Sequence, residues 1–119
     1  MVPVVDLTAD RFEELVVEAL DGLPEWVRER LDNVDVIVAD RPPPRQPNLL
    51  GLYEGIPLTK RGGGYFGVLP DRITLFRSSI VRGVRTEAQL RERIRHTVVH
   101  EIAHFFGISD ERLIELDRY

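Results

Sequence analysis

The sequence contains no cysteine, a single methionine and a single lysine among its 119 residues. The absence of cysteine excludes disulfides, thiolate metal sites and a thiol nucleophile, and it fits a reducing compartment such as the cytoplasm. No stretch approaches 18 uninterrupted apolar residues, and the first residues lack the basic start and long apolar run of a signal peptide. We therefore expect a cytoplasmic protein that makes no contact with a membrane.

The balance of apolar and charged residues is that of one globular domain, which we place over residues 1–119. Hydrophobic residues make up 43% of the chain and charged residues 30%, enough for both a buried core and a hydrated exterior. The formal net charge of -4 argues against a general nucleic-acid binder. Seven arginines fall within residues 72–95. We interpret them as part of a hydrated surface, with a phosphate-binding face as the alternative.

Helices are predicted near both ends of the chain. Asp10-Arg11-Phe12-Glu13 has the form of a capping box, and apolar residues at helical spacing follow it as far as Gly22. A short helix that begins at Pro24 should bury Trp26 in the core. Thr86-Glu87-Ala88-Gln89 is a second capping box, and the apolar stripe after it predicts a helix of roughly 20 residues that ends at Gly107.

Three short runs rich in β-branched and aromatic residues lie between these helices and are predicted as strands: Val34–Ala39, Leu49–Leu58 and Arg72–Phe76. Gly62–Gly67 matches G-x-G-x-x-G, but no helix can open directly after it, so we interpret it as a loop and not as a nucleotide site. Because the strands do not alternate regularly with the helices, the fold class is predicted as α+β.

Two histidines and a glutamate occur in the order H-E-x-x-H, at His100, Glu101 and His104. Residues four apart on a helix project from one face, about 6 Å apart along its axis, so both imidazoles can reach one tetrahedral Zn²⁺. Glu101 lies beside them and can take a proton from a metal-bound water. The sequence therefore predicts one zinc ion per chain with Glu101 as the general base.

A catalytic zinc takes three protein ligands and leaves a fourth position for water. Gly107 allows the chain to reverse under the metal, so we predict Asp110, six residues after His104, as the third ligand. The remaining downstream carboxylates are alternatives: Glu111, Glu115 and Asp117. They rank lower because helical geometry points them away from the turn.

His96 precedes His100 at the same spacing, but we do not predict it as a ligand. Three ligands spread over about 12 Å of straight helix cannot all lie about 2.1 Å from one ion. His96 is therefore interpreted as a surface residue or a neighbour of the ligands. The donor that would stabilise the oxyanion stays open among Tyr53, Tyr65, Tyr119 and nearby arginines.

The segment from Thr97 to Leu113, with the pattern H-E-x-x-H-x-x-G-x-x-D, resembles the small bacterial single-domain zincin-like metallopeptidases. Leu52–Leu58 and Leu69–Phe76 look like further segments of that family, so the resemblance covers most of residues 49–119. The pattern is also similar to that of the larger metzincin group, whose methionine turn has no counterpart here because Met1 is the only methionine.

This resemblance implies a minimal zincin fold, in which a small mixed β-sheet packs on a long active-site helix that is followed by a short C-terminal helix. It implies that His100, His104 and Asp110 are the zinc ligands, that Glu101 is the base and that the substrate is a peptide or protein. The first hypothesis is therefore a zinc metallopeptidase acting on peptide or other amide bonds. The alternative is a catalytically inactive metal-binding interaction module on the same scaffold, and nucleic-acid binding by the arginines ranks third.

Overall fold

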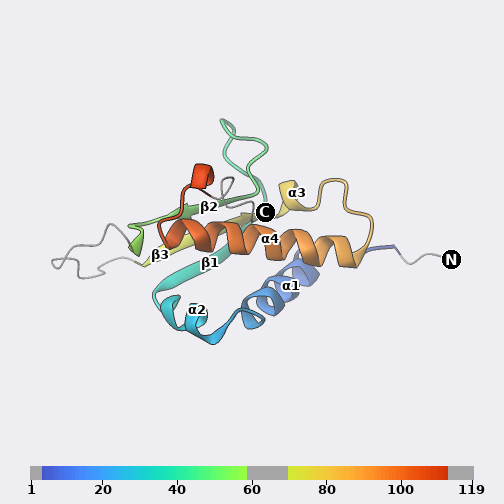
Figure 1. Cartoon of the computed structure of the whole chain (residues 1–119). Helices are drawn as coiled ribbons and strands as arrows, with labels where there is room; N and C mark the ends of the chain where they lie inside the picture. Colours follow the sequence, from blue (N-terminus) through green and yellow to red (C-terminus); the bar gives the residue numbers. More distant parts are fainter. Residues whose placement is uncertain (1–3, 59–69, 113–119) are drawn as a thin grey trace.

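The computed structural model describes residues 4–58 and 70–112 (Figure 1). In chain order the elements are α1 (Ala9–Asp21), α2 (Glu25–Arg30), β1 (Val34–Ala39), β2 (Gly51–Glu54), β3 (Asp71–Phe76), α3 (Arg77–Ile80) and α4 (Glu87–Phe105). The predicted α+β class is confirmed. The G-x-G-x-x-G segment lies outside the described residues.

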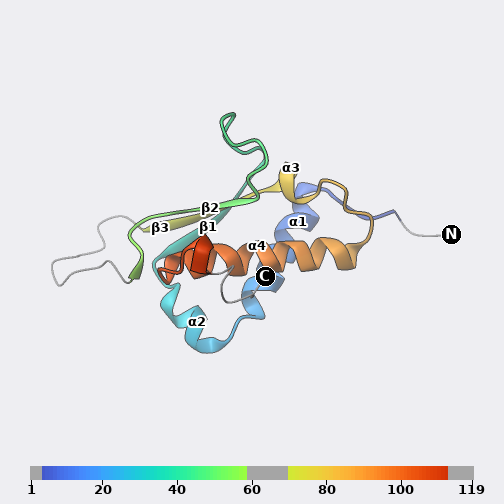
Figure 2. The same ribbon diagram turned by 45° about the horizontal axis from the view of Figure 1, so that its top comes forward.

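The strands form one mixed sheet in the order β1-β3-β2. β1 runs parallel to β3, whereas β2 runs antiparallel to it, with Tyr53 opposite Ile73. Figures 1 and 2 together show α4 lying along one face of this sheet, with α1 beside α4. The predicted arrangement of a small mixed sheet on a long helix is confirmed, and it leaves β2 as an edge strand above the C-terminal half of α4.

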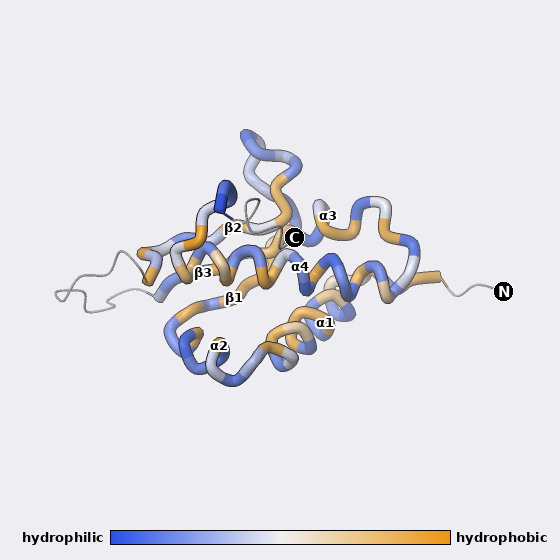
Figure 3. Tube along the Cα trace, in the orientation of Figure 1, coloured by the Kyte–Doolittle hydropathy of each residue, from blue (hydrophilic) through white to orange (hydrophobic). Residues whose placement is uncertain are grey.

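The core lies between α4, α1 and the central strand. In β3 every residue but Arg72 is buried, and α4 contributes a fully buried stripe that includes Leu90, Ile94 and Val98. Figure 3 shows the apolar stretches of strands and helices meeting between the layers, while the loop between β1 and β2 is mostly hydrophilic. Full burial of one such apolar side chain stabilises the fold by about 1.5–3 kcal/mol, so this stripe fixes the rotation of α4 and thus the direction of its polar residues.

Both ends of α4 form as the sequence predicts. At the start, the Thr86 hydroxyl accepts from the Gln89 N–H at 3.1 Å while the Gln89 side chain accepts from the Thr86 N–H, which completes the capping box. At the end, Gly107 adopts the left-handed conformation with φ 86°. α4 is therefore a continuous helix of 19 residues with both ends capped.

The predicted start of α1 was wrong by two residues. Thr8, not Asp10, caps this helix, because its hydroxyl accepts a hydrogen bond from the Arg11 N–H at 3.3 Å. Asp10 lies in the first turn instead, where the positive end of the helix dipole favours an acid. Both residues are suitable caps, and the sequence alone does not choose between neighbouring candidates.

Two further predictions were wrong, and one helix was missed. The second strand covers Gly51–Glu54 and does not reach Leu58, because the chain turns at Gly55. Gly55 has a φ of 153°, and a Cβ at this position would overlap the Asp71 carboxyl group. The short helix α3 was not predicted. Trp26 is 57% exposed and not part of the core, since α2 is a short helix of six residues that buries only Val27.

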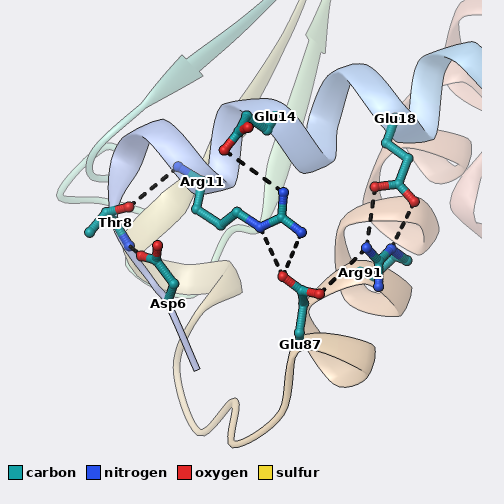
Figure 4. A network of polar contacts seen from close by, with 7 residues as sticks. All are labelled: Asp6, Thr8, Arg11, Glu14, Glu18, Glu87 and Arg91. Carbon is teal, nitrogen blue, oxygen red and sulfur yellow. Dashed lines mark hydrogen bonds and ion pairs between the residues drawn. The ribbon is translucent and has the colours of Figure 1, made fainter. Parts of the chain in front are cut away.

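A network of ion pairs joins α1 to α4 at the surface (Figure 4). The Arg11 guanidinium donates to Glu87 at 2.6 and 2.8 Å, and Arg91 donates to Glu18 at 2.9 Å. The hydrogen bond from Arg11 lowers the pKa of Glu87. These contacts are solvent-exposed, so they set the alignment of the two helices more than they stabilise them.

Within the described part of the chain, no helix combines the length and apolar character needed to cross a bilayer.

Candidate metal centre

The last turns of α4 bring two imidazoles together. His100 and His104 lie on one side of the helix with ring centroids 4.8 Å apart, and their Nε2 atoms are 3.1 Å from each other. The four-residue spacing creates this pairing locally, because residues one turn apart share a helix face. Both side chains are only partly buried, and both line a cavity.

A tight turn after α4 carries the third group to the histidines. The Gly107 N–H donates to the His104 carbonyl and the Ile108 N–H donates to the Ala103 carbonyl, each at 2.9 Å. Together with the left-handed Gly107 this pattern is a Schellman motif, which reverses the chain at a helix end. The reversal folds the following residues back over the polar side of α4.

Asp110 reaches the two imidazoles as a result. Its Oδ1 lies 2.9 Å from His100 Nε2 and 3.0 Å from His104 Nε2. Ser109 holds the position by accepting from the Arg112 N–H at 3.1 Å, which starts the next helical turn at Asp110. Among the described residues, these three are the group whose ligand atoms converge.

The alternatives to Asp110 differ in what the structure says of them. Glu111 is exposed and is not part of the convergent group. Glu115 and Asp117 lie outside the described residues.

A cation bound between these three atoms would satisfy all of them. The Nδ1 of His104 lies 2.7 Å from the Ile108 carbonyl oxygen, which can only accept, so Nδ1 carries the hydrogen. In the neutral ring Nε2 then offers a lone pair, and it faces a carboxylate oxygen that also offers one. Two acceptors at this separation repel each other unless a hydrogen or a metal ion lies close to both, and a bound metal ion would meet this need.

The lowered pKa of His100 is compatible with metal binding. Burial, reinforced by the neighbouring His104, lowers the pKa of His100, although Asp110 opposes the shift. At neutral pH the ring is therefore neutral and its lone pair is available to a metal. Two imidazoles and one carboxylate form a donor set that suits zinc.

The distances also fit zinc. Two ligand atoms bound tetrahedrally to one zinc ion lie about 3.3 Å apart, because each is about 2.0–2.1 Å from the metal. The three separations here are 2.9, 3.0 and 3.1 Å. His96 does not join the set: its ring centroid lies 6.4 Å from that of His100, and it is absent from the convergent group.

Glu101 lies on the inner side of α4, next to the three metal-ligand candidates. Its side chain is only 6% exposed, yet it lines the cavity that the metal ligands also line. Burial raises its pKa to about 7, against the lowering effects of His104 and of the hydrogen bond donated by the Tyr53 main-chain N–H. A carboxyl group with a pKa near neutrality can both accept and release a proton under ordinary conditions.

The cavity has a volume of about 460 Å³ and lies between the end of α4 and the edge strand β2. Gly51, Leu52 and Tyr53 line it from the strand, and the three metal-ligand candidates line it from the helix side. The site is therefore open to a molecule lying along β2.

Tyr53 is the one tyrosine among the oxyanion-donor candidates that lies within the described residues. Its hydroxyl donates to the buried Asp71 carboxylate at 2.6 Å, so this proton is already used within the protein. Tyr65 and Tyr119 lie outside the described residues, and no arginine is among the described residues that line the cavity.

Gly51 is a site residue that sequence reasoning missed. A Cβ at this position would lie 3.0 Å from Thr97 Cγ2 and 3.1 Å from Glu101 Cγ. The missing side chain therefore lets β2 approach α4 at the general-base candidate. No local signal marks this glycine, because its neighbours in space come almost 50 residues later in the chain.

Substituting Gly51 by alanine is expected to destabilise the protein by about 1–3 kcal/mol, since the added methyl group overpacks a close contact. Urea denaturation of the purified variant measures this. Gly22→Ala is the matched control: its Cβ would make an ordinary contact, 3.5 Å from the Glu18 carbonyl oxygen, at φ -80°. That variant should be neutral or slightly stabilised, and equal stability of both variants would contradict the close packing.

The raised pKa of Glu101 predicts a pH-dependent stability in the zinc-free protein. In the folded chain the carboxyl group holds its proton up to about pH 7, compared with 4.5 ordinarily. The folded state thus binds more protons than the unfolded state between these values, and stability falls as pH rises through this window. Glu101→Gln cannot ionise and is expected to gain about 3 kcal/mol over wild type between pH 4.5 and 8. Urea titrations with chelator measure it; a difference that does not vary with pH would contradict the raised pKa.

The arginines of residues 72–95 serve mostly internal contacts. Arg77 donates to Asp40 and Leu7, Arg82 to Asn48, and Arg93 to the Ile80 and Arg82 carbonyls. Arg91 and Arg95 pair with glutamates. Guanidinium groups engaged in this way make a poor phosphate-binding face, which favours the interpretation as structural surface residues.

Comparisons with known proteins agree with this geometry. No curated protein matched the chain. A conserved hypothetical protein from Thermo thermophilus has a similar structure, with a TM-score of 0.60 and 26% identity, covering 84% of this chain and 94% of that one. A family model described as zincin-like metallopeptidase matches residues 31–119. Since this match spans most of the sequence and includes every residue of the centre, the chain belongs to the zincin-like metallopeptidase family.

Proposed function

We propose that this protein is a zinc-dependent metallopeptidase that hydrolyses peptide or related amide bonds. The observation that carries the proposal is the convergence of three ligand atoms within about 3 Å, next to a buried glutamate in the same open cavity. Family membership supports it. Convergent ligands alone would support metal binding; the adjacent Glu101 is what supports hydrolysis.

In this proposal three side chains bind the metal and a fourth transfers the proton. His100, His104 and Asp110 hold the zinc ion, which when bound polarises the scissile carbonyl and acidifies water. Glu101 accepts one proton from the attacking water while the water oxygen bonds to the carbonyl carbon of the substrate. Glu101 then delivers that proton to the leaving amine as the C–N bond breaks.

Two supporting contacts keep these groups in place. The Ile108 carbonyl fixes the ring orientation and tautomer of His104 through Nδ1. The Tyr53 main-chain N–H holds the Glu101 carboxylate beneath the edge strand. An extended peptide lying along β2 would thus pass over both the ligands and the base.

The proposal is tested by incubating zinc-loaded protein with a mixture of synthetic peptides and identifying fragments by mass spectrometry. We expect fragments that disappear with chelator and return when zinc is restored. Zinc-loaded protein that yields no fragments from any peptide would overturn the proposal and indicate a metal-binding module instead.

We further propose that the enzyme acts in the cytoplasm. The lack of cysteine supports this, since such a chain has no need of an oxidising compartment. Fractionation of cells followed by detection of the protein would test it, and recovery outside the cytoplasmic fraction would contradict it.

A further inference from the structure

The cavity of the metal centre continues along α4. It shares Gly51 and Glu101 with a second cavity of about 270 Å³. That second cavity shares Leu50 and His96 with a third of about 710 Å³. The three cavities therefore lie in a row along α4, from its end toward its beginning, beside the segment that leads into β2, and we call this row the groove.

The groove is long enough for several residues of a peptide. Ala88 lines its far end and His100 its near end, and a separation of twelve residues spans about 18 Å of helix. An extended chain covers this distance in about five residues. An occupant that reaches from the metal centre to the far end must therefore be chain-like, which a peptide substrate is.

The far section is apolar despite its charged neighbours. Leu50 and Ala88 line it directly, His96 borders it toward the metal centre, and the polar ends of Gln89, Glu92 and Arg93 are engaged elsewhere. The Gln89 side-chain oxygen accepts from the Arg85 and Thr86 N–H groups. The Arg93 guanidinium donates to two backbone carbonyls, and Glu92 pairs with Arg95 at 2.6 Å. What these residues offer to the groove is largely their aliphatic stems.

We infer that the far section is a subsite for an apolar side chain of the peptide substrate, about five residues from the scissile bond. The inference rests on the proposed function, because continuity with the metal centre identifies the occupant. It specifies a substrate class: peptides long enough to reach beyond the cleavage site and carrying an aliphatic or aromatic residue at that distance.

Ala88→Arg tests the subsite by placing a long charged side chain in it. Ala88 is exposed in the first turn of α4, and arginine has a good helix propensity, although the helix dipole slightly disfavours a cation at this end. The matched control is Ala9→Arg, also exposed in the first turn of a helix but on α1. Both variants should bind zinc like wild type, which shows that the fold and metal centre are intact.

The primary readout is binding, measured by fluorescence anisotropy in a Glu101→Gln background, so that no turnover is needed. The probes are ten-residue peptides with leucine or serine at each position. Leucine at one position should tighten binding about tenfold or more over serine. This preference should vanish in Ala88→Arg and persist in Ala9→Arg. Equal affinity of leucine and serine peptides, or a preference that survives Ala88→Arg, would overturn the subsite.

Further outcomes separate this inference from the proposed function. Peptides that bind with the expected preference but are never cut by the wild-type protein would leave the subsite standing and refute the peptidase. Peptide cleavage whose sequence preference is unaffected by Ala88→Arg would support the peptidase and refute the subsite. If Ala88→Arg instead converts a dimer to a monomer in light scattering, the groove holds a second copy of the chain and the subsite is refuted.

Discussion

Replacing Glu101 by glutamine is expected to lower the rate of peptide cleavage about 10²- to 10⁴-fold, the usual contribution of a general base. Glutamine keeps the shape of the side chain and can still accept the hydrogen bond from the Tyr53 N–H. It cannot accept a proton from water. Zinc content should stay the same, because Glu101 is not among the three convergent ligand groups.

The measurement is kcat/KM on any peptide that the wild-type protein cleaves, together with zinc per chain for each variant. Glu111→Gln is the matched control, since Glu111 is an exposed acid in the turn after α4 and outside the convergent group. It should cleave at the wild-type rate. Wild-type activity in Glu101→Gln would show that another group accepts the proton and would refute the assigned role.

Replacing Asp110 by alanine is expected to weaken zinc binding more than 100-fold. Loss of a group that merely supports a ligand typically costs 10- to 100-fold in metal affinity, and Asp110 is assigned as a ligand itself. Its Oδ1 lies within 3.0 Å of both imidazole nitrogens, so its removal opens one whole side of the centre. Competition against a chelator of known zinc affinity gives the dissociation constant.

Glu111→Ala serves as the control, because it removes the neighbouring acid while leaving the turn and Ser109 unchanged. It should bind zinc as wild type does. If Asp110→Ala keeps wild-type affinity, the third ligand lies elsewhere, and variants of Glu115 and Asp117 would identify it.

The elements predicted best are those whose signals are local. β1 matches its predicted range, and α4 starts at its capping box and ends before Gly107 as expected. A periodic apolar stripe between a cap and a glycine leaves few alternatives. The errors occur where local signals compete or are weak, as at the cap of α1, or where tertiary packing decides, as with the exposure of Trp26.

The same distinction explains what could be inferred of the site. His100, Glu101, His104 and Asp110 lie within eleven consecutive residues, so helix and turn geometry alone predict that they come together. Gly51 and Tyr53 join them only because the edge strand packs on α4. The burial that raises the pKa of Glu101 depends on that same packing and has no sequence signature.

The buried position of Glu101 carries a cost that links stability to function. An ionised carboxylate with 6% exposure destabilises the zinc-free fold above neutral pH. The proposed catalytic role offers a reason for keeping it there, since a partly exposed glutamate with an ordinary pKa would be a weaker base. A variant that gains stability while losing turnover is what this account expects of Glu101→Gln.

The central claim is that His100, His104 and Asp110 bind one zinc ion. It is tested most directly by measuring zinc per chain with elemental mass spectrometry, on protein purified without chelator and again after dialysis against zinc. We predict close to one equivalent after dialysis in the wild-type protein and almost none in His100→Ala. A wild-type chain that binds no zinc after dialysis, or a His100→Ala variant that retains a full equivalent, would contradict the claim.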